Sequence, residues 1–380
     1  MKIFIVILSI SAIALGLLGL QLEHQNSLAV LAPALPTGTP WPDISGVIQQ
    51  DFVFTTTDNS YSVPAATLQT WVTPYWRAYT QRQEFNLKIE LVQAYLAEIA
   101  ATLDHPPQNA RLGADENGRL YEFIPAQTGL KLDVTATMLN LRRALNNGIS
   151  SAPLALIESI PAISLARLQA LGITARLGTG QSNFAGSPAS RVHNIRQGMS
   201  SFDGIILPAD REFSFNHWLG EVTASTGYEP ELVIKNKAAL PEYGGGLCQV
   251  STTLFRAVMA AGLPILERHP HTLSVRYYDP QGYDATIYPG VSDFRFKNDT
   301  ASPLFIQSEN KANDLIFTLY GRPDNRTVLI DGPHSYARDP GLKTWLKRIV
   351  TYPNGSSKKD VFYSNYQVPA IAPVARNPLE

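Results

Sequence analysis

The chain has 380 residues, of which 44% are hydrophobic and 17% are charged, and its formal net charge at pH 7 is -1. At about 100–200 residues per domain, this length predicts two or three domains, with enough apolar residues for sizeable cores. The near-neutral charge and the lack of an arginine-rich or lysine-rich run argue against a nucleic-acid partner.

The N-terminal segment is strongly apolar. Residues 3–20 contain no charged side chain, and their polar side chains are Ser9 and Ser11. As a helix, this stretch would rise about 27 Å, close to the roughly 30 Å hydrocarbon core of a bilayer. Residues 1–22 are therefore predicted to be either a signal anchor or a cleaved signal peptide. Both alternatives place the rest of the chain outside the cytoplasm, anchored in the membrane through this helix or secreted to the cell envelope.

The predicted fold class is α+β. A proline-rich linker over residues 23–44 leads into a small α+β domain over residues 45–178. This domain is expected to open with a strand pair at residues 52–56 and 59–63. Apolar residues at helical spacing predict helices, and Asp133 is a predicted N-cap. The predicted helices cover residues 64–71, 88–103 and 134–145.

A second α+β domain is predicted over residues 179–325. A β-rich extension over residues 326–366 follows it, and residues 367–380 are predicted to be a disordered tail. The extension is expected to contain strands near residues 327–330, 347–352 and 361–363.

The second domain contains the only cysteine of the chain, Cys248, directly after three glycines and a leucine. Beyond it, apolar residues recur at helical spacing until Gly262. Cys248 is therefore predicted at a helix N-terminus, where the helix dipole favours a thiolate and lowers the thiol pKa. The backbone N–H groups there could also stabilise an oxyanion.

A histidine and an aspartate follow the cysteine. Residues 272–278 and 283–288 are rich in β-branched and aromatic side chains and are predicted to form a hairpin, with a turn at residues 279–282. Pairing of the two strands would bring Asp284 beside His271. Cysteine, histidine and aspartate occur in this order in papain-like and transglutaminase-like thiol enzymes. The pattern predicts Cys248 as nucleophile, His271 as general base and acid, and Asp284 as the group that orients His271.

Five further residues are predicted to bind ligand around this site. Gly245 and Gly246 permit close approach to the backbone, and Gln249 could donate to an oxyanion. Asn216 is expected at the end of a strand with alternating phenylalanines, and His269 precedes His271 by two residues. Local backbone capping by Gln249 and Asn216, and a buried inert thiol, are the structural alternatives.

Two histidines two residues apart also permit a zinc site. His269 and His271 would share it with Cys248 or Asp284. Neither a CxxC nor an HxxxH spacing supports this alternative, so the leading interpretation contains no metal and no cofactor.

Several motifs together resemble the VanW family over roughly residues 180–320. They are residues 191–195 (RVHNI), 213–216 (FSFN), 244–254 (GGGLCQVSTTL), 267–271 (ERHPH) and 284–286 (DAT). Leu247, Thr272 and Phe255 depart from the common pattern without removing a candidate catalytic group. Upstream, residues 103–110, 123–125 and 129–133 resemble the peptidoglycan-binding-like domain that often precedes cell-wall enzymes.

The resemblance implies a cell-envelope protein with peptidoglycan as its partner. The family takes its name from a glycopeptide-resistance gene cluster, but the resemblance supplies no biochemical activity. Three functions therefore remain open at this point. They are a thiol hydrolase or acyl transferase of stem peptides, a non-catalytic membrane-anchored peptidoglycan-binding scaffold, and a zinc-site protein.

Overall fold

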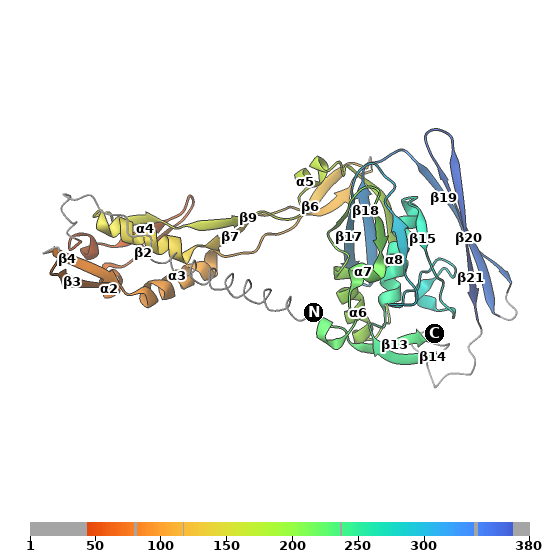
Figure 1. The fold of residues 1–380 in the computed structure, drawn as a ribbon, viewed down its shortest axis with the longest axis horizontal. Helices are drawn as coiled ribbons and strands as arrows, with labels where there is room; N and C mark the ends of the chain where they lie inside the picture. Colours follow the sequence, from red (N-terminus) through yellow and green to blue (C-terminus); the bar gives the residue numbers. More distant parts are fainter. Residues whose placement is uncertain (1–43, 80–81, 117, 236–237, 338–340, 368–380) are drawn as a thin grey trace, which may run out of the picture. The chain divides into compact units, whose positions relative to one another are not determined.

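The computed structural model describes residues 44–79, 82–116, 118–235, 238–337 and 341–367 (Figure 1). Contacts divide the chain into two compact units, Met1–Leu103 with Leu132–Ile157 (unit 1) and Asp104–Lys131 with Glu158–Glu380 (unit 2). Residues 45–178 therefore contribute to both units. The predicted signal segment, most of the linker and most of the predicted tail lie outside the described residues.

The predicted fold class requires one correction. It included an N-terminal membrane helix, but no helix in the described part of the chain is long and apolar enough to span a membrane. The longest described helix, Ile89–Leu103, has 15 residues, and a helix of that length rises only about 22 Å. The fold is accordingly a mixed α+β architecture with several small sheets.

Unit 1 confirms the predicted strand pair and helices. β1 (Phe52–Thr55) pairs antiparallel with β2 (Ser60–Val63) and parallel with β8 (Ser151–Pro153). Asp133 caps α4, because its carboxylate accepts from the Ala136 N–H at 2.9 Å. The remaining elements are η1 (Val47–Gln49), α2 (Ala65–Trp71), β3 (Val72–Arg77), β4 (Arg82–Leu87), α3 (Ile89–Leu103) and α4 (Val134–Asn146).

The centre of unit 2 is a four-stranded sheet against which the predicted cysteine helix packs. The sheet order is β10 (Ala175–Asn183), β18 (Asp314–Gly321), β17 (Leu304–Lys311) and β11 (Ile205–Leu207). α8 (Leu247–Ala260) lies so close to β10 that a Cβ on Gly180 would stand 2.2 Å from the Thr253 carbonyl oxygen. Glycine at this position therefore allows the close packing of helix on sheet.

Smaller elements complete unit 2. β12 (Glu212–Ser214), β16 (Arg295–Lys297) and β15 (Ile265–Glu267) form one sheet, and β13 (Pro230–Lys235) pairs with β14 (Ala238–Tyr243). β7 (Gly129–Leu132) pairs with β9 (Leu156–Ser159), and each of these two strands contains residues of both units. The others are β5 (Arg111–Ala114), β6 (Leu120–Ile124), α5 (Leu165–Ala170), α6 (Ala189–Ser200), α7 (Phe215–Leu219), η2 (Ala224–Thr226) and η3 (Arg276–Tyr278).

Residues 327–337, 342–351 and 357–366, within the predicted β-rich extension, form an antiparallel three-stranded sheet. Its strands are β19 (Thr327–Ala337), β20 (Leu342–Thr351) and β21 (Ser357–Tyr366), with β20 in the centre.

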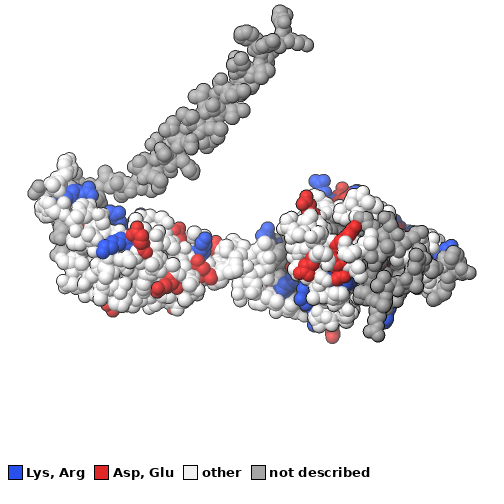
Figure 2. All heavy atoms as spheres, turned by 90° about the horizontal axis from the view of Figure 1, so that it is seen from below, with Lys and Arg blue, Asp and Glu red and all other residues white. Residues whose placement is uncertain are grey.

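Figure 2 shows one face of the described surface, on which charged side chains of both signs are interspersed among uncharged ones. That mixture agrees with the formal net charge of -1.

The predicted hairpin over residues 272–288 is wrong. In this stretch the structure has only η3 and isolated bridges, which pair Leu273 with Gln367, Thr286 with His269 and Tyr288 with Ser292. The guanidinium of Arg256, on α8, donates to the carbonyl oxygens of Tyr278, Asp279 and Tyr283 at 2.9–3.1 Å. These acceptors are therefore satisfied by a side chain from the helix, and the backbone needs no strand partner there.

Candidate functional site

Cys248 lies in the first turn of α8, as predicted. Gly246 is the N-cap of this helix and has a φ of 113°, a conformation that side chains rarely adopt. A Cβ there would also stand 2.9 Å from Cγ1 of Ile195. The glycine therefore lets the chain turn sharply into the helix. The N–H groups of a first helical turn have no acceptor within the helix, so that of Cys248 can serve a bound oxyanion.

The thiol itself is partly buried among polar groups. Its Sγ lies 3.4 Å from the hydroxyl oxygen of Thr286 and 3.6 Å from the carbonyl oxygen of Ile287. Both partners follow Asp284 closely in the chain, so the same segment that carries the aspartate also holds the sulfur.

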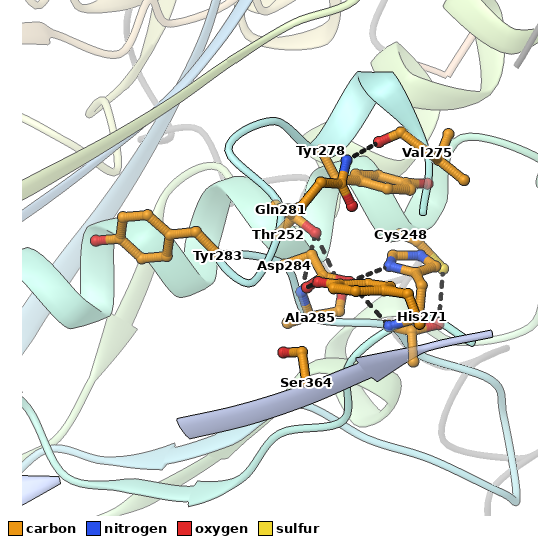
Figure 3. A network of polar contacts seen from close by, with 12 residues as sticks. Cys248, Thr252, His271, Val275, Tyr278, Gln281, Tyr283, Asp284, Ala285 and Ser364 are labelled. Carbon is orange, nitrogen blue, oxygen red and sulfur yellow. Dashed lines mark hydrogen bonds and ion pairs between the residues drawn. The ribbon is translucent and has the colours of Figure 1, made fainter. Parts of the chain in front are cut away.

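His271 and Asp284 form a buried pair beside the thiol. Nδ1 of His271 donates to Oδ2 of Asp284 at 2.5 Å, and the backbone N–H of His271 donates to the same oxygen at 2.8 Å. The imidazole stacks on the ring of Tyr278 with centroids 4.1 Å apart. Figure 3 shows the imidazole lying between the Asp284 carboxylate and the Cys248 sulfur.

The second oxygen of Asp284 is also fully engaged. Oδ1 accepts from the Tyr366 hydroxyl at 2.6 Å and from Nη2 of Arg268 at 3.0 Å. The Asp284 side chain is only 1% exposed. Because each oxygen has fixed donors, the carboxylate cannot rotate away from His271, and the orientation of the imidazole is fixed in turn.

These contacts set the charges of the three groups. Burial raises the pKa of Asp284, but His271 and Arg268 outweigh it and hold that pKa well below its usual range. Burial lowers the pKa of His271, but the Asp284 carboxylate and Cys248 raise it to about 9. Burial likewise opposes ionisation of Cys248, yet its neighbour His271 brings the thiol pKa below its ordinary value. The arrangement favours an imidazolium beside a thiolate.

A cavity of about 650 Å³ opens at the sulfur. Cys248 and His271 line it together with all three glycines before the helix, so the predicted Gly245 and Gly246 do reach the site. The wall also includes Arg191 on α6 and residues of β13 and β14. Nε2 of His271 is buried and has no hydrogen-bond partner among the described residues, which leaves it available for proton transfer.

The other three predicted binding residues do not line this cavity. Gln249 is fully buried, and its side-chain nitrogen donates to the Asn183 carbonyl at 2.9 Å. Asn216 lies in α7 and not at a strand end, and its side-chain nitrogen donates to the Ser292 carbonyl at 2.9 Å. His269 is half exposed and pairs with Glu267 at 3.1 Å.

The zinc alternative finds no geometric counterpart in the described ranges. They contain no group of three or more histidine, cysteine, aspartate and glutamate side chains placed to hold a metal ion. His269 is turned to Glu267, whereas His271 is buried against Asp284.

Sequence reasoning missed the residues that support the pair. Arg268 lies inside the motif of residues 267–271 that carries part of the family resemblance, so that motif could have pointed to it. Thr286 was quoted in the same way without a role. Tyr366 lies 82 residues after Asp284 in the chain, and no local pattern marks it.

Comparisons with known families match two separate ranges of the chain to the two families that its motifs resemble. Residues 190–320 match the family described as "VanW like protein". Residues 42–152 match the family described as "Putative peptidoglycan binding domain".

Two curated relatives extend these matches. "Uncharacterized protein YoaR" of Bacillus subtilis is 31% identical over 272 residues, which is 69% of this chain and 88% of that protein. "Vancomycin B-type resistance protein VanW" of Enterococcus faecalis is 28% identical over 159 residues, 40% of this chain and 58% of that protein.

Among solved structures, an Enterococcus faecium L,D-transpeptidase mutant matches 32% of this chain and 45% of its own. The identity is 8% and the TM-score 0.20. A likeness of this size carries no conclusion about fold or activity.

Proposed function

Because the chain belongs to the VanW family and carries a peptidoglycan-binding domain that associates it with the cell wall, we propose that it is a thiol enzyme of the cell envelope. Its substrates are amide bonds in the stem peptides of peptidoglycan. The observation that carries this proposal is the imidazole of His271, hydrogen-bonded to Asp284 on one side and facing the Cys248 sulfur on the other, at the wall of an open cavity.

The first half of the reaction forms a thioester. The Cys248 thiolate attacks the amide carbonyl carbon, and the negative charge that develops on the oxygen faces the first turn of α8. The carbon–nitrogen bond then breaks. His271 gives its Nε2 proton to the departing amine, which leaves a neutral imidazole and an acylated Cys248.

The second half releases the product. A water molecule or an amine attacks the thioester carbonyl and gives a proton to Nε2 of His271, and the thiolate departs. Water yields hydrolysis, whereas an amine from a neighbouring stem peptide yields transfer. Asp284 stays ionised throughout and stabilises the imidazolium.

The test compares the full-length protein with its Cys248→Ala variant on purified sacculi. We expect mass spectrometry of the muropeptides to show changed stem peptides with the native protein. Loss of the nucleophile should lower the rate by about 10³-fold or more. Cosedimentation with sacculi should stay unchanged and serves as the folding control.

Equal rates for the two proteins would overturn the catalytic proposal. That outcome, together with retained cosedimentation, would favour the non-catalytic peptidoglycan-binding protein.

A further inference from the structure

A buried arginine at the cavity wall has no role in the reaction described above. Arg191 is 3% exposed and lines the cavity. Its Nη2 donates to Oε1 of Gln249 at 2.8 Å, and its guanidinium lies over the ring of Tyr277 at 4.3 Å from the centroid. Its Nε is buried without a hydrogen-bond partner among the described residues.

The absence of a counter-ion distinguishes this arginine from three other buried arginines of unit 2. The guanidinium groups of Arg268, Arg326 and Arg348 are each at least nine-tenths buried, and each is ion-paired with an aspartate. No described carboxylate lies within ion-pair distance of Arg191. An amide oxygen and an aromatic face do not neutralise a buried charge, so the free protein keeps an unsatisfied cation at the cavity wall.

The Arg191 guanidinium lies close to residues that adjoin Cys248 and His271. Gln249, which accepts from Arg191, directly follows Cys248 in α8. Tyr278 stacks on His271, and the Arg191 guanidinium opposes the rise that burial causes in the pKa of Tyr278. The guanidinium therefore contacts the residue that follows Cys248 and lies close to the ring that stacks on His271.

The ligand chemistry follows from the donors. A guanidinium presents five N–H donors in a planar fork that matches a carboxylate, and such bonds are stronger than those between neutral groups. Among the described residues, Nη2 donates to Gln249 and the guanidinium also interacts with the Tyr278 hydroxyl, whereas Nε has no partner. A carboxylate placed in the cavity against this guanidinium would neutralise its charge.

We propose that Arg191 binds the free C-terminal carboxylate of the substrate peptide. The bond that Cys248 attacks is then the last amide of a stem peptide, and the leaving group is its C-terminal amino acid. This inference rests on the proposed function for the identity of the reaction, but carboxylate binding by Arg191 is measurable without turnover.

The experiment measures binding to the full-length Cys248→Ala variant by calorimetry. The probes are diacetyl-L-lysyl-D-alanyl-D-alanine as the free acid and the same peptide as its C-terminal amide. We expect the acid to bind at least tenfold more tightly than the amide. Adding Arg191→Gln should reduce this ratio to below twofold. Arg295→Gln, which changes a half-exposed arginine of the same unit, should leave it unchanged.

Three results would overturn the assignment: equal affinity for the two peptides, a ratio that survives Arg191→Gln, or no binding of either peptide at millimolar concentration. The comparison of acid with amide uses the native arginine, so equal affinity would overturn the assignment even if the Arg191 variant fails to fold. Acid preference without turnover by the native protein would remove the proposed enzyme and keep the carboxylate site. Turnover without acid preference would remove the Arg191 site alone.

Discussion

His271 owes its charge to its partners and not to its burial. A buried imidazole is normally neutral, because a low-dielectric environment disfavours the cation. Here the Asp284 carboxylate at 2.5 Å reverses that tendency and raises the pKa of His271 to about 9. The imidazolium in turn favours ionisation of Cys248. Reactivity of the thiol therefore depends on a carboxylate that does not touch it.

The Asp284→Asn variant tests this dependence. Without the carboxylate, burial should lower the pKa of His271, the imidazolium should be lost at neutral pH, and the pKa of Cys248 should rise. We expect the pH profile of Cys248 alkylation by iodoacetamide to move to higher pH. In the native protein the imidazolium persists until the pH passes about 9, so the thiolate should react well below the ordinary thiol pKa.

The extension offers a matched control for that variant. Asp331 forms a comparable pair with His334 at 2.6 Å, but at the surface. Asp331→Asn should leave the alkylation profile unchanged. A profile that is the same in native and Asp284→Asn proteins would show that the carboxylate does not govern the thiol.

At the scale of elements, β21 of the C-terminal extension takes part in the site. The hydroxyl of Tyr366, at the end of this strand, donates to Oδ1 of Asp284 and accepts from the Gly282 N–H at 2.7 Å. In β20, Arg348 is ion-paired with Asp360 of β21 and donates to the Leu263 carbonyl just beyond α8. The extension is therefore built into unit 2 and supports the aspartate directly.

Tyr366→Phe should destabilise the protein for this reason. The change leaves a buried N–H without its acceptor and a buried carboxylate oxygen without one donor, which costs about 1–3 kcal/mol. Urea denaturation followed by fluorescence measures the free energy of unfolding. Tyr363→Phe on the same strand is the control, since Tyr363 is 65% exposed and should change stability by less than about 0.5 kcal/mol. Equal effects of the two substitutions would argue against the hydroxyl's role.

At the scale of the whole molecule, the two units have separate hydrophobic cores. The core of unit 1 includes Phe52, Phe54 and Leu96, all fully buried. The core of unit 2 surrounds α8 and the central sheet. The match to the peptidoglycan-binding family covers residues 42–152, whereas Cys248 belongs to unit 2. Damage to the first core should therefore leave the thiol chemistry intact.

Leu96→Ala tests this separation. Deleting a fully buried leucine side chain costs about 2–5 kcal/mol, so unit 1 should unfold at a lower temperature and cosedimentation with sacculi should weaken. The rate of Cys248 alkylation should not change. Leu91→Ala on the same helix is the control, because Leu91 is 42% exposed. A parallel fall in thiol reactivity would mean that the two units unfold as one.

Local pattern alone determined most elements of this protein. Residue periodicity was sufficient for β1, β2 and the helices of unit 1, and Asp133 was recognisable as a cap because capping depends on neighbours three residues away. The start of α8 at the glycines was predictable for the same reason. The pairing of His271 with Asp284 was also expected, but on the basis of a hairpin that the structure does not contain.

Only the tertiary structure decided how that pair is held. The expected hairpin does not form, and Arg256 from α8 instead bonds three carbonyl groups of this segment. Tyr366 reaches Asp284 across 82 residues, and Arg191 reaches the cavity from α6. Contacts between segments far apart in the chain leave no periodic trace in the sequence, whereas helices and turns do, because their hydrogen bonds join near neighbours.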